Sequence, residues 1–156
     1  MGNYTFRGFL VLSLFCLAGL PEARAQNTDA SQEIPRITVH ERPNCNCCSR
    51  WVEHLKKNGF EVDASHSDSL SNVKDEAGIP DSLRSCHTAF VDDYVIEGHV
   101  PAKVIKRMLR EQPDVMGLAV PGMPIGSPGM EMEGREPESY EIITFTKDTT
   151  RVYTRR

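Results

Sequence analysis

The chain is 156 residues long, carries a formal net charge of −4 at pH 7, and 26% of its residues are charged. This length suits one ordinary domain. The sequence contains no block of basic residues, which argues against a nucleic acid as a partner. Paired carboxylates, a nucleophilic serine triad and a phosphate-binding glycine loop also do not stand out in it.

The first 25 residues have the layout of a secretory signal peptide. Arg7 gives a positive start, residues 8–20 form an apolar run, and residues 23–25 (ARA) are a small-x-small cleavage site. The apolar run of thirteen residues is too short to span a bilayer, which takes about twenty. We therefore expect export, cleavage after Ala25, no membrane anchor in the mature chain, and a setting in which disulfides can form.

The exported chain is expected to fold as one domain over residues 36–156. Residues 26–35 are polar and predict a disordered lead-in. Residues 37–40 (ITVH) are rich in β-branched side chains and predict a strand, which Pro43 closes.

The strongest helix prediction covers residues 45–58. Four side chains recur at the spacing of one helix face: Cys48, Trp51, Val52 and Leu55. Asn44 is the expected N-cap, and Gly59 fits the C-terminal end.

Further elements follow in alternation. The expected ranges are a strand over 60–64, a short helix over 69–77, two strands within 88–97 around an Asp-Asp turn, a helix from Pro101 through 102–111, and a closing hairpin of 140–145 and 151–154. The order β-α-β-α-β-β-α is that of the thioredoxin fold. The sequence therefore predicts an α/β, thioredoxin-like domain with a central mixed sheet, flanking helices and a C-terminal hairpin.

Residues 112–139 form a long connection without periodicity. They hold five of the ten prolines and five of the eleven glycines, together with Met116, Met123, Met130 and Met132. A connection of this length is a functional loop or a disordered segment. The methionines are either gap fillers in the core or thioether ligands presented by the loop.

Three cysteines crowd one turn in "NCNCCSRW". Signal cleavage removes Cys16 and leaves Cys45, Cys47, Cys48 and Cys86. The first three lie after a strand and at the start of a helix, where the free N–H groups and the helix dipole favour thiolates. Cys48 is expected to be buried beside Trp51 and Cys45 to be exposed at the tip.

Cys86 comes just before the third strand. In a thioredoxin-like fold that junction lies beside the start of the first helix, so Cys86 and His87 should face the cluster across a gap. Three interpretations remain open: a thiol oxidoreductase using Cys45 and Cys48, a structural zinc site, and a soft-metal site for Cu(I). Cys47, inserted into the C-x-x-C pair, favours the metal, because clustered thiolates can bridge several ions.

Other ligand candidates support a soft metal. Met123, Met130 and Met132 would supply thioethers, and thiolate plus thioether ligands select Cu(I). His87 adjoins Cys86 as a ligand or as a group that orients one, and His99 precedes a helix from which it could face the site.

Three segments, "CNCCSRWVEHLKKNGFEV", "SCHTAFVDDYVIEGHVPA" and "GLAVPGMPIGSPGMEM", together resemble the CopG-type family of exported copper-resistance proteins, long filed as a domain of unknown function. The resemblance runs from about residue 36 to 154. It implies a thioredoxin-like fold, a periplasmic setting and a role in copper resistance. It also allows Cu(I)/Cu(II) redox activity and makes other periplasmic copper-handling proteins candidate partners.

The resemblance also implies a set of copper ligands. Cys45, Cys47 and Cys48 carry over as the core ligands, Cys86 and His87 as the facing pair, and His99 and the loop methionines as outer neighbours. The cis-proline usual before the third strand of the fold is missing, and Cys86 and His87 stand there instead. Its absence weakens the thiol-oxidoreductase interpretation, because that proline shapes the substrate groove. Storage, transfer to a partner and redox turnover of copper all remain open.

Overall fold

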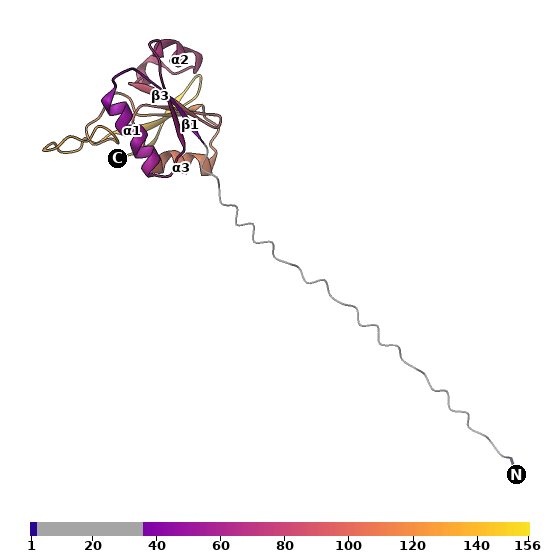
Figure 1. Ribbon diagram of the computed structural model, residues 1–156. Helices are drawn as coiled ribbons and strands as arrows, with labels where there is room; N and C mark the ends of the chain where they lie inside the picture. Colours follow the sequence, from indigo (N-terminus) through magenta and orange to yellow (C-terminus); the bar gives the residue numbers. More distant parts are fainter. Residues whose placement is uncertain (3–35) are drawn as a thin grey trace. The chain divides into compact units, whose positions relative to one another are not determined.

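The computed structural model describes residues 1–2 and 36–156 (Figure 1). Apart from the first two residues, the predicted signal peptide and the predicted lead-in lie outside the described residues. Among the residues described, none of the helices has the length and apolar character that a membrane crossing requires.

Helices and strands alternate along most of the described chain. The elements in order are β1 (Ile37–Glu41), α1 (Asn46–Lys57), β2 (Val62–His66), α2 (Leu70–Glu76), the 3-10 turn η1 (Asp81–Leu83), β3 (His87–Val91), β4 (Tyr94–Glu97), α3 (Ala102–Glu111), β5 (Gly117–Ala119), β6 (Glu141–Phe145) and β7 (Thr150–Arg155). The predicted α/β class is confirmed.

The seven strands form one mixed sheet in the order β2-β1-β3-β4-β5-β6-β7. Strand β1 is parallel to β2, while β3 runs antiparallel to both β1 and β4. Strand β5 then adds parallel to β4, and the hairpin β6-β7 follows as the predicted C-terminal pair. The arrangement of β1 to β4 with three helices is compatible with the thioredoxin-like fold.

Core residues lie on both faces of the central strands, because successive side chains of a strand point to opposite faces, whereas the edge strands β2 and β7 are largely exposed. Side chains of α1 and α3, such as Trp51 and Ile105, pack against Ile96 and its neighbours in the larger core cluster. Val95, which alternates with Ile96 along β4, belongs to a second cluster that includes Phe145. In Figure 1, α1 and α3 lie away from α2 across the sheet. The four predicted face residues of α1 are all buried.

Two local predictions around α1 are wrong. Cys45, not Asn44, occupies the N-cap position, and Asn44 has a left-handed φ of 63°. The strand expected from residue 60 begins only at Val62. Helix α1 ends in a turn in which Gly59 takes a φ of 88° and the Phe60 N–H donates to the Leu55 carbonyl oxygen. This closing turn occupies the residues assigned to the strand.

The connection 112–139 contains regular structure that was not predicted. Strand β5 lies within it, between β4 and β6. Met116 packs against the second core cluster and is therefore a core residue. Three residues are too few to show a period, and both partners of β5 are distant in the sequence.

Candidate metal centre

The first turn of α1 carries three cysteines with different exposure. Cys48 is fully buried on the same face as Trp51, as predicted. Cys45 and Cys47 are half-buried. The expected exposure of Cys45 is thus only partial, because its sulfur is bonded to that of buried Cys48.

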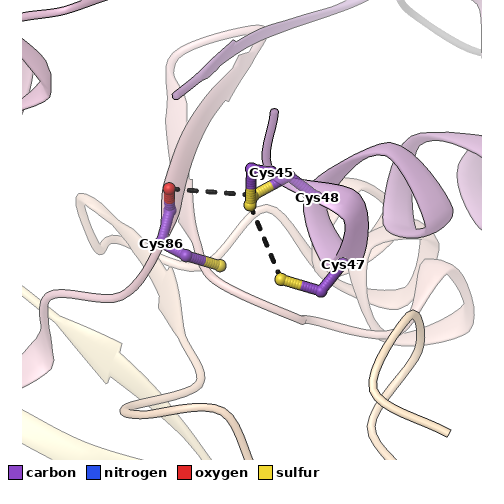
Figure 2. A group of neighbouring side chains, drawn as sticks. All are labelled: Cys45, Cys47, Cys48 and Cys86. Carbon is purple, nitrogen blue, oxygen red and sulfur yellow. Dashed lines mark hydrogen bonds between the residues drawn. A yellow bond between two sulfur atoms is a disulfide. The ribbon is translucent and has the colours of Figure 1, made fainter. Parts of the chain in front are cut away.

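A disulfide joins Cys45 to Cys48, whose Cα atoms are 5.3 Å apart (Figure 2). Within the described part of the chain, Cys47 and Cys86 carry free thiols. The Cys47 thiol donates to Cys45 Sγ over 3.5 Å. The C-x-x-C pair is therefore oxidised while the inserted cysteine keeps its thiol.

Cys86 faces this turn from the residue before β3 (Figure 2). Its carbonyl oxygen lies 3.8 Å from Cys48 Sγ, and its own sulfur points toward Cys47. The four sulfur atoms all lie within 4.8 Å of one another. The fold thus brings Cys86 to the position across the helix start that the sequence suggested.

Two buried histidines lie behind Cys86. Its sulfur is 3.3 Å from His87 Nδ1 and 3.1 Å from His99 Nε2. The Nδ1 atom of His99 is 2.8 Å from the carbonyl oxygen of Pro128, so it must be the protonated nitrogen. The Nε2 lone pair of His99 is therefore directed at the Cys86 sulfur. Cys86 thus belongs to two sets of possible metal ligands, the four cysteines and the trio of Cys86, His87 and His99.

His87 is held in an apolar setting. The ring packs against Trp51 with centroids 4.3 Å apart, and its Nε2 has no hydrogen-bond partner among the described residues. Burial, together with the charges of His99 and Lys74, lowers the pKa of His87 well below its usual value. Burial also lowers the pKa of His99. Both imidazoles are neutral near pH 7, the form that can bind a metal.

The pKa of the Cys86 thiol is shifted in the opposite direction, upward. Burial, followed by the nearby charge of Cys47, raises its pKa to about 12. A soft cation would have to displace the Cys86 proton, as thiol ligands generally require.

The loop methionines lie at the mouth of the cluster. Met123, Met130 and Met132 line an open cavity of about 700 Å³ together with Cys45 and Cys47. Met123 also lines a second cavity, of about 410 Å³, with Cys86. Met123 and Met132 are 52% and 51% exposed, which is incompatible with a role as core fillers.

A close approach fixes this loop on α1. Gly129 has a φ of 87°, and a Cβ atom there would lie 2.6 Å from the carbonyl oxygen of Cys47. Only glycine allows the two backbones to come this close. The neighbouring Pro128 accepts the hydrogen bond from His99. The loop therefore contacts both the cysteine turn and the histidine pair.

A buried ion pair behind the site was not predicted. Glu97 is fully buried, and its Oε1 lies 2.6 Å from Lys74 Nζ, which is itself almost fully buried. The Ser85 N–H donates to Oε1, and the Thr88 hydroxyl donates to Oε2 over 2.7 Å. One carboxylate therefore holds the backbone before Cys86 and the side chain after His87. These contacts fix the chain on both sides of the Cys86-His87 pair, and residues 36–156 contain no cis peptide bond.

The neutral histidines predict acid sensitivity of the metal-free protein. An unfolded chain takes up a proton at His87 below about pH 6.5, but the folded chain does not, so unfolding becomes more favourable as the pH falls. This residue alone should lower the free energy of unfolding by about 1.4 kcal/mol per pH unit in that range. Urea titrations between pH 7 and 5 measure the free energy of unfolding, which should fall less steeply with decreasing pH for His87→Phe than for the wild type. Glu41, whose pKa burial raises, is present in both proteins, so its contribution cancels in the comparison. An equal dependence on pH in the two proteins would refute the assignment of His87 as neutral in the folded state.

Comparison with known proteins places the chain in a family. A family model described as "Protein of unknown function, DUF411" matches residues 83–130.

Two solved structures are similar to this chain. "Copper resistance protein copG- Form 2" is 43% identical, with a TM-score of 0.75, and the match covers 80% of this chain and 99% of that one. "Copper resistance protein copG- Form 1" is 44% identical, with a TM-score of 0.74, and the match covers 80% of this chain and 98% of that one. A search of curated proteins gives no match. On this identity and coverage, the chain belongs to the CopG family of copper resistance proteins.

Proposed function

We propose that this protein binds Cu(I) as a cysteine thiolate cluster in the periplasm and so contributes to copper resistance. The observation that carries the proposal is the set of four cysteine sulfurs within 4.8 Å of one another. Soft thiolate ligands suit Cu(I), and they also bind zinc and iron–sulfur clusters. The relatives described as copper resistance proteins support copper as the cargo. The predicted signal peptide supports the periplasm.

The donor set fits several copper ions better than one zinc ion. Three of the four sulfurs come from one helix turn, which crowds the tetrahedron that a structural zinc site prefers. Sulfurs this close together can instead bridge neighbouring cuprous ions. The Cys45–Cys48 bond must be reduced before all four act as thiolates, whereas Cys47 and Cys86 are already free.

Outer donors extend this set on two sides. His99 directs its Nε2 lone pair at Cys86, and His87 adds a neutral imidazole beside it. We assign Met123, Met130 and Met132 to the open side, where a weakly held Cu(I) would pass from thioether to thiolate.

Cu(I) titration of the reduced protein tests this function. Anaerobic titration against a competing cuprous chelator should show tight binding, and X-ray absorption should report mainly sulfur neighbours. The triple variant Cys45→Ser, Cys47→Ser, Cys48→Ser should lose the bound copper, since only Cys86 would remain of the four sulfurs. Tight zinc binding without preference for Cu(I), or unchanged copper stoichiometry in the triple variant, would rule the proposal out.

One observation favours a second candidate function, thiol–disulfide oxidoreductase activity. The Cys45–Cys48 disulfide lies at a helix start, the context of redox C-x-x-C pairs. The sequence weighs against it, because Cys86 and His87, not a proline, stand at the start of β3. The reduced, metal-free protein can be assayed for reduction of a protein disulfide. Turnover would support the oxidoreductase function, and its absence would leave copper binding as the function.

Exposure of two loop methionines favours a further role in copper transfer. Met123 and Met132 are exposed to solvent, as a donor to a second copper-handling protein would have to be. Transfer by direct contact should slow when both are changed to Leu, while the stoichiometry at the cysteines stays the same. Stopped-flow transfer to a cuprous acceptor protein, compared with a small chelator, measures this effect.

A further inference from the structure

We propose that His54 of α1 is a positioning residue for His99: it holds the start of α3 so that His99 Nε2 is directed at the Cys86 sulfur. The inference rests on the proposed function in taking Cu(I) as the cargo and His99 as a donor to it. Among the described residues, His54 belongs to neither of the two sets of possible metal ligands. Its role is therefore indirect and runs through the backbone that carries His99.

Two side chains of α1 hold the segment between β4 and α3. The indole N–H of Trp51 donates to the Val100 carbonyl oxygen over 2.9 Å, and the Ala102 N–H donates to His54 Nε2 over 3.1 Å. Trp51 and His54 are three positions apart, so they lie next to each other on the helix surface. Both bonds reach the residues that directly follow His99, and together they tie its backbone to α1.

The bond to His54 satisfies a backbone group that α3 cannot satisfy itself. The first N–H groups of a helix have no acceptor within that helix. Helix α3 begins at Ala102, and its N-cap residue, Pro101, forms no side-chain cap. Ala102 is fully buried, so its N–H depends on an acceptor from the protein instead of water. His54 Nε2 takes the place of the missing cap.

The His54 ring is in the form that this contact requires. An Nε2 atom that accepts a hydrogen bond carries no proton, so the proton of the neutral ring lies on Nδ1. Burial is the largest effect on the ring and lowers the pKa of His54, which keeps it neutral near pH 7. The charge of Lys57 also lowers this pKa, while that of Glu131 opposes the shift.

The same helix carries the cysteine turn, so α1 sets the distance between the sulfurs and the histidines. Cys48, Trp51 and His54 follow one another at steps of three residues along α1. Trp51 also packs against the His87 ring, with centroids 4.3 Å apart. One rigid element therefore positions the thiols at its start and both imidazoles further along its length.

The His99 ring has a second anchor with a different effect. Its Nδ1 lies 2.8 Å from the Pro128 carbonyl oxygen, which decides which nitrogen faces Cys86. His54 decides instead where the backbone of His99 lies, and with it the separation of 3.1 Å between His99 Nε2 and Cys86 Sγ. Loss of the His54 acceptor should therefore move the ring away from the sulfur without changing which nitrogen is protonated.

The Cu(I) affinity of variants at this position tests the inference. His54→Leu removes the acceptor and should weaken Cu(I) binding by about tenfold to 100-fold, as loss of a group behind a metal ligand typically does. His54→Gln places a carboxamide oxygen near the position of Nε2 and should restore most of the affinity. Glu53→Gln, an exposed neighbour on the same helix, is the matched control and should bind as the wild type does. Competition with a cuprous chelator measures each affinity.

A double-variant cycle separates positioning from general loosening of the fold. If His54 acts through His99, His54→Leu should change the affinity by less than about twofold in a protein that already carries His99→Ala. An equal loss in both backgrounds would show a purely structural role and would overturn the inference. A His54→Gln protein as weak as His54→Leu would overturn it as well, because the acceptor would then not be the reason for the loss.

Measurements on the metal-free protein distinguish failure of this inference from failure of the proposed function. NMR signals of the His99 imidazole nitrogens should shift in His54→Leu and stay near the wild-type values in His54→Gln. If His54→Leu does not fold, His54→Asn replaces it, since its shorter side chain does not reach the Ala102 N–H. Shifted signals in a protein whose wild type binds no Cu(I) would support the positioning role and refute the proposed function. Tight Cu(I) binding with unmoved His99 signals would overturn the inference and leave the proposed function intact.

Discussion

Cys47→Ser is expected to lower the affinity of the reduced protein for Cu(I) by about 100-fold or more. Formation of the Cys45–Cys48 disulfide should change much less. The reason is the place of this sulfur. Cys47 lies 3.5 Å from Cys45 Sγ, faces Cys86, and lines both cavities that open on the cluster. A serine hydroxyl is a hard donor that does not replace a thiolate for Cu(I).

Competition with a cuprous chelator measures this loss, and alkylation mass spectrometry measures the disulfide. Ser49→Ala is the matched control, because Ser49 lies on the same helix turn but is exposed to solvent. It should bind copper as the wild type does. If Cys47→Ser bound Cu(I) normally but failed to form the Cys45–Cys48 disulfide, a thiol-exchange role would replace the metal role.

Glu97→Leu is expected to destabilise the fold by about 3–5 kcal/mol, because the Lys74 ammonium then lies buried without its partner. The Ser85 N–H and the Thr88 hydroxyl lose the carboxylate oxygens that accept their hydrogen bonds. Chemical denaturation of the metal-free protein measures the cost. The backbone around Cys86 should also loosen, since Glu97 holds the residues on both sides of the Cys86-His87 pair.

Two double variants separate stability from positioning. Lys74→Met with Glu97→Leu removes both buried charges and should recover much of the lost stability. Its Cys86 should still be alkylated faster than in the wild type, and it should bind less copper than the wild type. Lys74→Met with Glu97→Gln keeps a carbonyl acceptor for the Ser85 N–H and should retain more copper. If the two double variants bound copper equally, Glu97 would have only a structural role.

Features set by neighbouring residues were predictable from the sequence. The buried face of α1 follows from the spacing of Cys48, Trp51, Val52 and Leu55, because each apolar side chain returns to the same side after one turn. The β3-β4 hairpin follows from two β-rich segments around a short polar turn. The convergence of Cys86 on the cysteine turn followed from the order of elements once the fold class was assumed.

Features that depend on distant pairs were not predictable. Lys74 and Glu97 are 23 residues apart, and each alone has the pattern of an exposed charge on a helix or at a strand end. The contact of Gly129 with Cys47 brings together backbones that no local period connects. The selection of Cys45 and Cys48 as the oxidised pair depends on the geometry of one helix turn, which spacing alone leaves open among three thiols.

The ends of the methionine-bearing connection meet on adjacent strands. Ala119 pairs with Ile143 between β5 and β6, so the intervening segment leaves the sheet and returns to it at nearly the same point. Loop-closure free energy changes slowly with length, by about 0.6 kcal/mol for each doubling. The parts of this segment on either side of Pro128 and Gly129 can therefore change in length and composition at little cost to the sheet, whereas these two residues contact His99 and Cys47 and must stay. Chimeras that exchange residues 121–127 and 130–139 but keep Pro128 and Gly129 should change the donors in front of the cysteines while the sheet and the thiols stay the same.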